Sequence, residues 1–189
     1  MLASARELFV TKGYVATTIA DIARHARVAV DTVYATVGRK PALLREVLES
    51  ALSGTDAVVP AEQRDYVKRS QQAARATDKI TAYVEGLVRL QSRLAPVFLV
   101  VRDASGIDPD SAVEWTRIAE RRARNMRMFA ADLRTTGELR DDLSDAEVAD
   151  IIWSMNGPEY WRLLVVDRGW PPERFGTHLV DAWTRILLS

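Results

Sequence analysis

Residues 17–44 read TTIADIARHARVAVDTVYATVGRKPALL and have the pattern of two short helices joined by a tight turn. Thr18 and Asp21 have the spacing of a capping box, with Asp in place of Glu, and predict a helix start. An apolar face follows at positions i, i+3, i+4 and i+7, made of Ile19, Ile22, Ala23 and Ala26. We therefore expect a first short helix, a break around Arg27 and a second short helix from Val30.

The second short helix is expected to have one inner and one outer face. Val33 and Val37 fall on the inner face. The outer face holds Val30, Asp31, Tyr34 and Ala35. Pro41 suits the first turn of a third helix, where its missing N–H group costs nothing. Two helices joined so tightly bury little surface alone, which is typical of a helix-turn-helix motif that presents its second helix to a DNA groove.

Residues 1–50 contain a dense set of motif residues. They are Gly13-Tyr14, Thr17-Thr18-Ile19, Ile22-Ala23, Ala26, Val28, Thr32-Val33-Tyr34, Lys40 and Leu43. Together they resemble the DNA-binding domain of the TetR (tetracycline-repressor-like) family of transcriptional regulators. The resemblance implies an all-α chain with a three-helix helix-turn-helix domain over residues 1–40, a connector helix over 41–54, and a helical effector-binding and dimerisation domain over 55–189. It also implies a few more, often basic, residues ahead of Met1.

Three positions depart from the family pattern. The turn position usually held by glycine is Arg27, the usual Ser after it is Ala29, and the aromatic position before Gly38 is Val37. A non-Gly residue with positive φ costs about 1 kcal/mol. We therefore expect a reshaped turn at Arg27 and base contacts that differ from those of other members.

The resemblance also assigns roles within this domain. It implies that Thr17 or Thr18, together with Tyr34, Thr36 and Lys40, holds phosphates, and that Val30, Asp31 and Ala35 face base edges. A hydroxyl beside free N–H groups at a helix N-terminus makes a phosphate seat. Val30 and Ala35 can meet a thymine methyl group, and Asp31 could accept from cytosine N4. Asp31 is equally well explained as a first-turn charge that favours the helix dipole.

Composition bounds the class of protein. The chain has 189 residues, 48% of them hydrophobic and 28% charged, which is ordinary for a soluble globular protein with a substantial core. Its apolar runs at 97–101 and 163–166 are far too short to span a membrane, so we expect a soluble cytoplasmic protein. The net charge is zero overall, but residues 1–55 have seven Lys or Arg and five Asp or Glu, which permits DNA binding without demanding it.

The rest of the chain reads as helices throughout. Beside the connector, helices are expected over 2–12, 61–75, 77–105 with an interruption at Pro96, 108–136, 144–156, 158–167 and 173–188. Residues 54–60 form a hinge-like boundary between Gly54 and Pro60. No alternating strand pattern is found, so the fold class is all-α.

The C-terminal helices predict a dimer. The segments 144–156, 158–167 and 173–188 each have a wide apolar stripe, and 160–166 is apolar almost all round, which indicates a helix covered on every side. Two copies packed through these helices make a homodimer. Its two helix-turn-helix domains, residues 1–40 of each chain and called the head below, match a palindromic double-stranded DNA operator. The alternative is that these helices only complete the core of one chain.

The middle helices supply candidate effector residues. They are Tyr83, Gln91, Phe98, Trp115, Arg122, Met126, Phe129, Trp153 and Asn156. Large rings with few polar groups are typical of small-molecule cavities and suit a small apolar or amphipathic effector, but they are also typical of ordinary cores. Arg122 lies on an otherwise apolar stripe, so it pairs either with an anionic ligand or with an acid of the chain.

An enzyme is not supported by the sequence. The chain has only His25 and His178, no Cys, and no P-loop, GxGxxG or HExxH motif, so we expect no catalytic site, cofactor or metal. The predicted function is a ligand-responsive transcriptional regulator, a repressor released from its operator when an effector shifts helices near 105–110 against the connector. The alternative is an all-helical dimer with a degenerate reader that acts through protein–protein contact.

Overall fold

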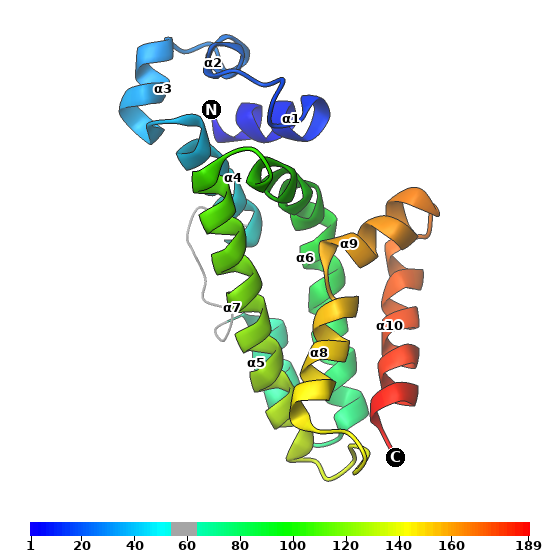
Figure 1. Cartoon of the computed structure of the whole chain (residues 1–189). Coiled ribbons are helices and arrows are strands. Elements are labelled where there is room, and N and C mark those ends of the chain that lie inside the picture. The colour runs from blue at the N-terminus through cyan, green and yellow to red at the C-terminus, as the bar shows by residue number, and fades with distance from the viewer. Residues whose placement is uncertain (54–63) are drawn as a thin grey trace. The chain divides into compact units, whose positions relative to one another are not determined.

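The computed structural model describes residues 1–53 and 64–189 (Figure 1). Within these residues every regular element is a helix, and one isolated antiparallel bridge joins Leu139 to Leu188. The all-α prediction is thus confirmed. No helix in the described ranges has both the length and the apolarity required to cross a bilayer. The predicted hinge over 54–60 lies outside the described residues.

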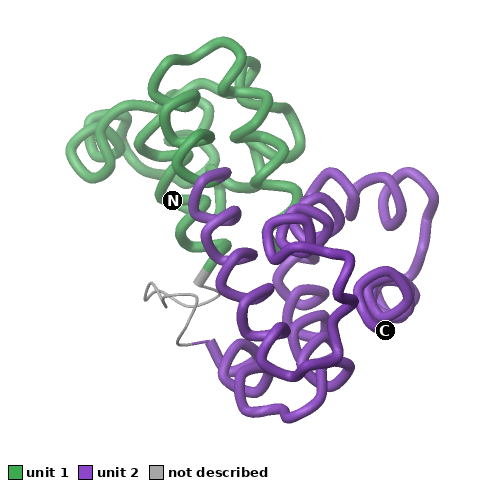
Figure 2. Tube along the Cα trace, turned by 60° about the horizontal axis from the view of Figure 1, so that its bottom comes forward, with its two compact units in different colours: residues 1–58, 93–118 green, residues 59–92, 119–189 purple. Residues whose placement is uncertain are grey.

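The chain divides into two compact units (Figure 2). The first contains Met1–Val58 and Arg93–Ile118, and the second contains Val59–Ser92 and Ala119–Ser189. Residues 93–118 were expected in the effector domain, whereas compactness groups them with the N-terminal helices. Long-range packing decides this grouping, and helical periodicity carries no information about it.

Four N-terminal helices build most of the first unit. They are α1 (Leu2–Lys12), α2 (Ile19–Ala26), α3 (Val30–Val37) and α4 (Lys40–Ser53). Phe9 of α1, Ile22 of α2, Val33 of α3 and Leu43 of α4 are all buried. Each helix therefore contributes one apolar face to a shared core, as the i, i+3, i+4 spacing predicts.

The predicted capping box starts α2. The Asp21 N–H donates to Thr18 Oγ1 at 3.0 Å, and the Thr18 N–H donates to Asp21 Oδ2 at 3.1 Å. These two bonds satisfy backbone donors that a helix N-terminus otherwise leaves free. Hydrogen bonds from the Thr18 side chain and backbone lower the pKa of the Asp21 carboxyl group.

The turn between α2 and α3 is not reshaped, contrary to expectation. Arg27 has φ 55 and ψ 43, the left-handed conformation that glycine would adopt there. Its N–H donates to Arg24 O at 3.2 Å, and the Val28 N–H donates to Ala23 O at 3.0 Å. The last carbonyl groups of α2 are satisfied by these bonds, so the turn is kept at the cost of a strained arginine backbone.

The second unit contains the remaining helices. They are α5 (Asp65–Gln72), α8 (Asp145–Met155), α9 (Pro158–Trp161), the π-helix η2 (Arg162–Asp167) and α10 (Pro172–Leu187), with parts of α6 (Ala76–Ser105) and α7 (Pro109–Arg134). The predicted capping box of Ser144 and Glu147 opens α8. Pro96 was expected to interrupt its helix, but α6 continues through it. A helix tolerates the lost donor at a cost of about 3 kcal/mol when its neighbours pack well, and Leu94, Ala95, Val97 and Phe98 are all buried.

The segment 158–167 departs most from expectation. A helix covered on every side was predicted, but η2 exposes 57% of Leu163 and 64% of Val166 in the single chain. Hydrophobicity alone cannot distinguish a residue buried in its own chain from one buried against a partner.

We expect Arg27→Gly to raise the free energy of unfolding by about 0.5–1 kcal/mol, because glycine adopts the left-handed conformation without a Cβ clash. Urea unfolding followed by circular dichroism measures the change. The control Arg24→Gly lies inside α2 and should lower the free energy of unfolding by about 1 kcal/mol. A loss of stability in Arg27→Gly would contradict the strain at this turn.

Candidate nucleic-acid interface and ligand cluster

Helix α3 has one buried and one open face. Val33 is fully buried and anchors the helix. The predicted outer residues Val30, Asp31, Tyr34 and Ala35 are all exposed, and Tyr34 is 51% exposed. Thr36, predicted as a phosphate contact, is exposed as well. Five of the predicted DNA contacts are therefore accessible on α3.

The two candidate threonines have different surroundings. Thr17 is fully buried, and its Oγ1 donates to Gly13 O at 2.8 Å and lies 3.1 Å from Leu8 O. Its side chain therefore locks α1 to the start of α2. Thr18 is exposed next to the first N–H groups of α2, although its hydroxyl also serves the capping box. Thr18 is the accessible member of the pair.

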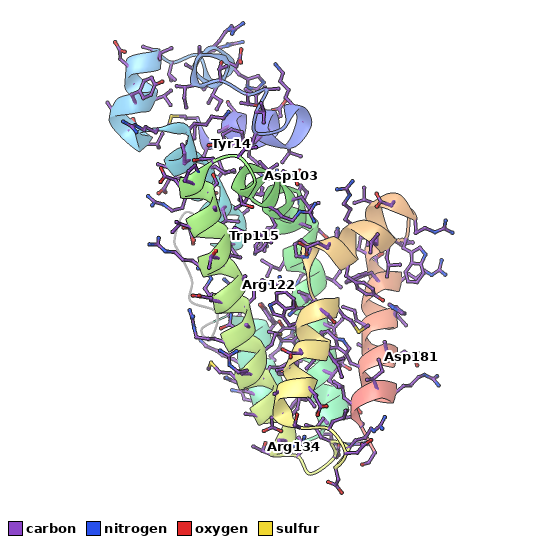
Figure 3. All side chains as sticks on the ribbon, in the orientation of Figure 1. Tyr14, Asp103, Trp115, Arg122, Arg134 and Asp181 are labelled. Carbon is purple, nitrogen blue, oxygen red and sulfur yellow. The ribbon has the colours of Figure 1, made fainter. Side chains whose placement is uncertain are left out.

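Lys40 at the start of α4 lies against Tyr14. Its Nζ is 4.1 Å from the centroid of the Tyr14 ring, and the Tyr14 hydroxyl donates to Asp108 Oδ2 at 2.8 Å. Desolvation by burial lowers the pKa of the Lys40 ammonium group, against an opposing effect of Asp108. Figure 3 labels Tyr14 beside the end of α6. Nothing in the sequence signals this contact between positions 14 and 108.

Arg39 is an exposed cation that was not among the predicted phosphate contacts. Arg39 is exposed between Gly38, which has φ 76, and the first residue of α4. Its position beside Thr36 and Lys40 makes it a candidate phosphate ligand. The positive charge of residues 1–55 was the available signal, but a charge count does not identify positions.

A buried polar cluster lies in the second unit. The Gln91 amide donates to Asn156 O at 2.6 Å, and Asn156 Nδ2 lies 3.3 Å from the Tyr83 hydroxyl and 2.8 Å from Met126 Sδ. Arg122 Nη2 donates to Asn156 Oδ1 at 2.7 Å. The structure thus brings together five of the nine predicted effector residues.

Two groups of this cluster are incompletely matched. Gln91 is only 3% exposed, and its Oε1 finds no donor among the described residues. Arg122 lies with its guanidinium 4.9 Å from the Trp153 ring centroid and donates to Trp153 O at 3.0 Å. Desolvation lowers the pKa of Arg122, and Glu159 opposes this shift. Figure 3 labels Arg122 on α7.

The other predicted aromatic residues pack as core. Phe129 stacks on Tyr83 at a centroid distance of 4.5 Å in the second unit. Phe98 and Trp115 form an edge contact at 5.9 Å in the first unit. The nine residues therefore do not form one site, because Phe98 and Trp115 belong to a different unit from the rest.

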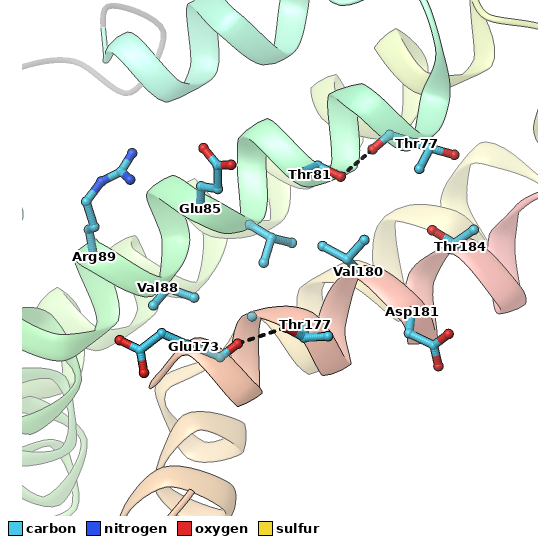
Figure 4. A pocket seen from close by; sticks show the side chains of 12 residues that line it. Thr77, Thr81, Glu85, Val88, Arg89, Glu173, Thr177, Val180, Asp181 and Thr184 are labelled. Atoms are coloured by element: carbon cyan, nitrogen blue, oxygen red, sulfur yellow. Dashed lines mark hydrogen bonds between the residues drawn. The ribbon is translucent and has the colours of Figure 1, made fainter. Parts of the chain in front are cut away.

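A separate groove lies between α6 and α10 (Figure 4). It has a volume of about 700 Å³. Its apolar lining comes from Val84, Val88, Gly176 and Val180, and its polar lining from Thr77, Thr81, Glu85, Arg89, Glu173, Thr177, Asp181 and Thr184. None of the predicted effector residues is among the residues that line it.

The histidines show no catalytic arrangement. His178 Nε2 lies 2.7 Å from the Tyr160 hydroxyl and packs against the Trp170 ring. His25 Nε2 lies 3.7 Å from Glu7 at the surface of α2. The described residues contain no group of three or more acids or histidines able to hold a metal ion.

Comparison with known proteins agrees with this geometry. Residues 1–47 match the family model of bacterial regulatory proteins, tetR family. No curated protein sequence matches the chain. These 47 residues include α1, α2, α3 and the start of α4.

Solved structures share the fold over the whole chain at low sequence identity. The TetR family transcriptional regulator PfmR from Thermus thermophilus has a TM-score of 0.72 at 20% identity, covering 97% of this chain and 96% of its own. NalD, a secondary repressor of an efflux pump in Pseudomonas aeruginosa, has a TM-score of 0.72 at 18% identity, covering 99% and 94%.

A transcriptional regulator from Saccharomonospora viridis, solved in complex with choline, has a TM-score of 0.73 at 20% identity, covering 100% and 95%. Such low identities establish a shared fold alone. The chain therefore shares the fold of these solved regulators over its length, and its residues 1–47 match the family model of bacterial regulatory proteins, tetR family.

Proposed function

We propose that this protein is a ligand-responsive repressor that binds a palindromic DNA operator as a homodimer and leaves it when a small molecule binds. The observation that carries the proposal is the open face of α3, where Tyr34, Asp31 and Ala35 are exposed while Val33 is buried. A helix held by one side with its other side free can enter a major groove. Because its proposed target is genomic DNA, the protein is proposed to act in the cytoplasm.

Contacts to phosphates are proposed at the start of α2 and after the C-terminal end of α3. Thr18, Thr36 and Lys40 supply hydroxyl and ammonium groups, and Arg39 adds a charge. Base edges are left to Val30, Asp31 and Ala35. Phosphate contacts position the head, and base contacts supply the sequence preference.

The homodimer is proposed to form through the C-terminal helices. Leu163 and Val166 of η2 and Ile186 of α10 are large apolar side chains exposed in the single chain. Trp153 of α8 is also partly exposed. Exposed large apolar residues are typical of an interface that a second copy covers.

The effector is proposed to be a small apolar or amphipathic molecule that contacts the polar cluster. Gln91 Oε1 offers a buried acceptor, and Arg122 offers further N–H donors beside the Trp153 ring. NalD is a repressor, and the Saccharomonospora viridis protein was solved with choline. Proteins of this fold therefore include a repressor and one that binds a small molecule. The effector must favour the released state by a few kcal/mol to empty the operator.

DNA binding is tested with a duplex recovered by selection from a random pool. We expect Kd to rise steeply with salt, and Tyr34→Ala and Thr36→Ala each to weaken binding about tenfold through a lost contact. Fluorescence anisotropy at several salt concentrations measures both effects.

Thr11→Ala is the matched control for Thr36→Ala. Each hydroxyl donates to the carbonyl four residues earlier, Glu7 O and Thr32 O, and each is exposed. Only Thr36 belongs to α3, so Thr11→Ala should leave Kd unchanged. Binding that is indifferent to salt would instead favour the protein-contact role.

Dimerisation is tested with Val166→Glu. We expect this charge to weaken the dimer at least about tenfold, because it places a carboxylate in a buried apolar contact. Light scattering with size-exclusion chromatography measures the mass over a dilution series. Val113→Glu is the control, because it alters a similarly exposed valine of α7. The mass measured for this variant should remain that of a dimer. A wild-type monomer at all concentrations would refute the interface.

The effector cluster is tested with Gln91→Met and an effector found in a screen for loss of DNA binding. We expect the variant to fold and its effector affinity to fall about fivefold to tenfold, since one buried hydrogen bond is lost. The effector-induced rise in Tm measures this. Gln72→Met changes an exposed amide on α5 and should respond like the wild type. An equal rise in Tm for Gln91→Met would place the effector elsewhere.

A further inference from the structure

We propose that Asp108 and Tyr14 form a relay that positions the Lys40 ammonium group for a DNA phosphate and connects it to helix α7. The inference rests on the proposed DNA-binding function. All three residues belong to the first unit, although Asp108 is 94 positions from Tyr14 along the chain.

Asp108 is fixed to the first turn of α7. The Asp110 N–H donates to Asp108 Oδ1 at 3.2 Å, and the Ser111 hydroxyl donates to Oδ2 at 2.9 Å. The Ala112 N–H donates to the Asp108 backbone oxygen at 2.9 Å. Such bonds cap a helix N-terminus. The Asp108 carboxylate must therefore move with α7.

Tyr14 joins that carboxylate to the head. Its hydroxyl donates to Asp108 Oδ2 at 2.8 Å, and its ring packs 5.8 Å from the Phe9 ring in the head core. Tyr14 is buried. Burial, reinforced by the Asp108 hydrogen bond, raises the pKa of the Tyr14 phenol, so the hydroxyl remains a donor. A buried ring with both ends held has little freedom to turn.

Lys40 is placed by this ring. The ammonium group lies over the Tyr14 face at 4.1 Å, a distance at which cation and ring quadrupole attract. The partly buried side chain therefore has one preferred direction, at the N-terminus of α4. Free N–H groups and the helix dipole at such an N-terminus already favour a phosphate.

Helix α7 connects the relay to the proposed effector cluster. It begins at Pro109 beside Asp108 and continues to Arg134. Arg122 and Met126 of the proposed effector cluster lie on the same helix. A shift of α7 that pulls Asp108 from Tyr14 would release the ring and with it the direction of Lys40.

The test is a double-mutant cycle on DNA affinity, with the duplex recovered from the random pool. We expect Lys40→Met to weaken binding about tenfold and to lower the log Kd–log salt slope by about 0.9, the loss of one phosphate contact. Tyr14→Phe and Asp108→Asn should each weaken binding about threefold to tenfold. In the Lys40→Met background they should change Kd less than about 1.5-fold, because their effect passes through Lys40.

Thr116→Ala is the control, since it removes an exposed hydroxyl of α7 that donates to Ala112 O and contacts none of the three relay residues. It should bind DNA like the wild type. Equal losses from Tyr14→Phe with and without Lys40 would overturn the relay and leave a structural role. So would an unchanged Kd in Tyr14→Phe.

A second readout needs no DNA. The Tyr14 ring current should shift the Lys40 Cε protons upfield in an NMR spectrum of the 13C-lysine-labelled protein, and Asp108→Asn should reduce this shift at least by about half. Because Asn also caps helices, this variant keeps the first turn of α7. An unchanged Lys40 shift overturns the relay by itself. If the wild-type protein shows the shift but no salt-dependent DNA binding, the relay is supported and the proposed function is wrong.

Discussion

The side chain and backbone of Asn156 hold the second unit in register. This residue ends α8, receives a hydrogen bond from Arg122 of α7, and lies within hydrogen-bonding distance of Tyr83 of α6. Its backbone oxygen accepts from Gln91, also on α6. A buried amide left without partners costs several kcal/mol, so the three helices are bound to the arrangement that satisfies it. A molecule that offers Gln91 or Arg122 a better partner therefore acts on all three helices together.

The first unit follows the same constraint at a smaller scale. The Thr17 hydroxyl satisfies a carbonyl group at the end of α1, and Tyr14 satisfies the carboxylate that caps α7. Buried polar groups of the head are thus used internally to fix its joints. The exposed face of α3 fixes no joint of the head. The buried polar groups are therefore structural, whereas the residues on this face can contact a ligand.

Periodicity and capping signals were sufficient to predict most helices. The Thr18–Asp21 and Ser144–Glu147 boxes set helix starts within the chain itself, so local sequence determines them. Gln91, Arg122 and Asn156 were selected as effector candidates by residue type, because few polar residues fall on those apolar faces, and their role in binding stays a prediction. The contact of Tyr14 with Asp108, the continuation of α6 through Pro96 and the π-helix η2 depend on distant packing. No local pattern encodes them.

The surface of α3 has a consequence for how an operator would be distinguished from other DNA. Its outward groups at Val30 and Ala35 are methyls, which sense thymine and little else in the major groove. No arginine, asparagine or glutamine occupies residues 30–37 to grip guanine or adenine with two bonds. Beyond these methyl groups and the Asp31 carboxylate, discrimination would fall on the duplex, on flexible pyrimidine–purine steps and stiff A-tracts that deform at different energetic cost.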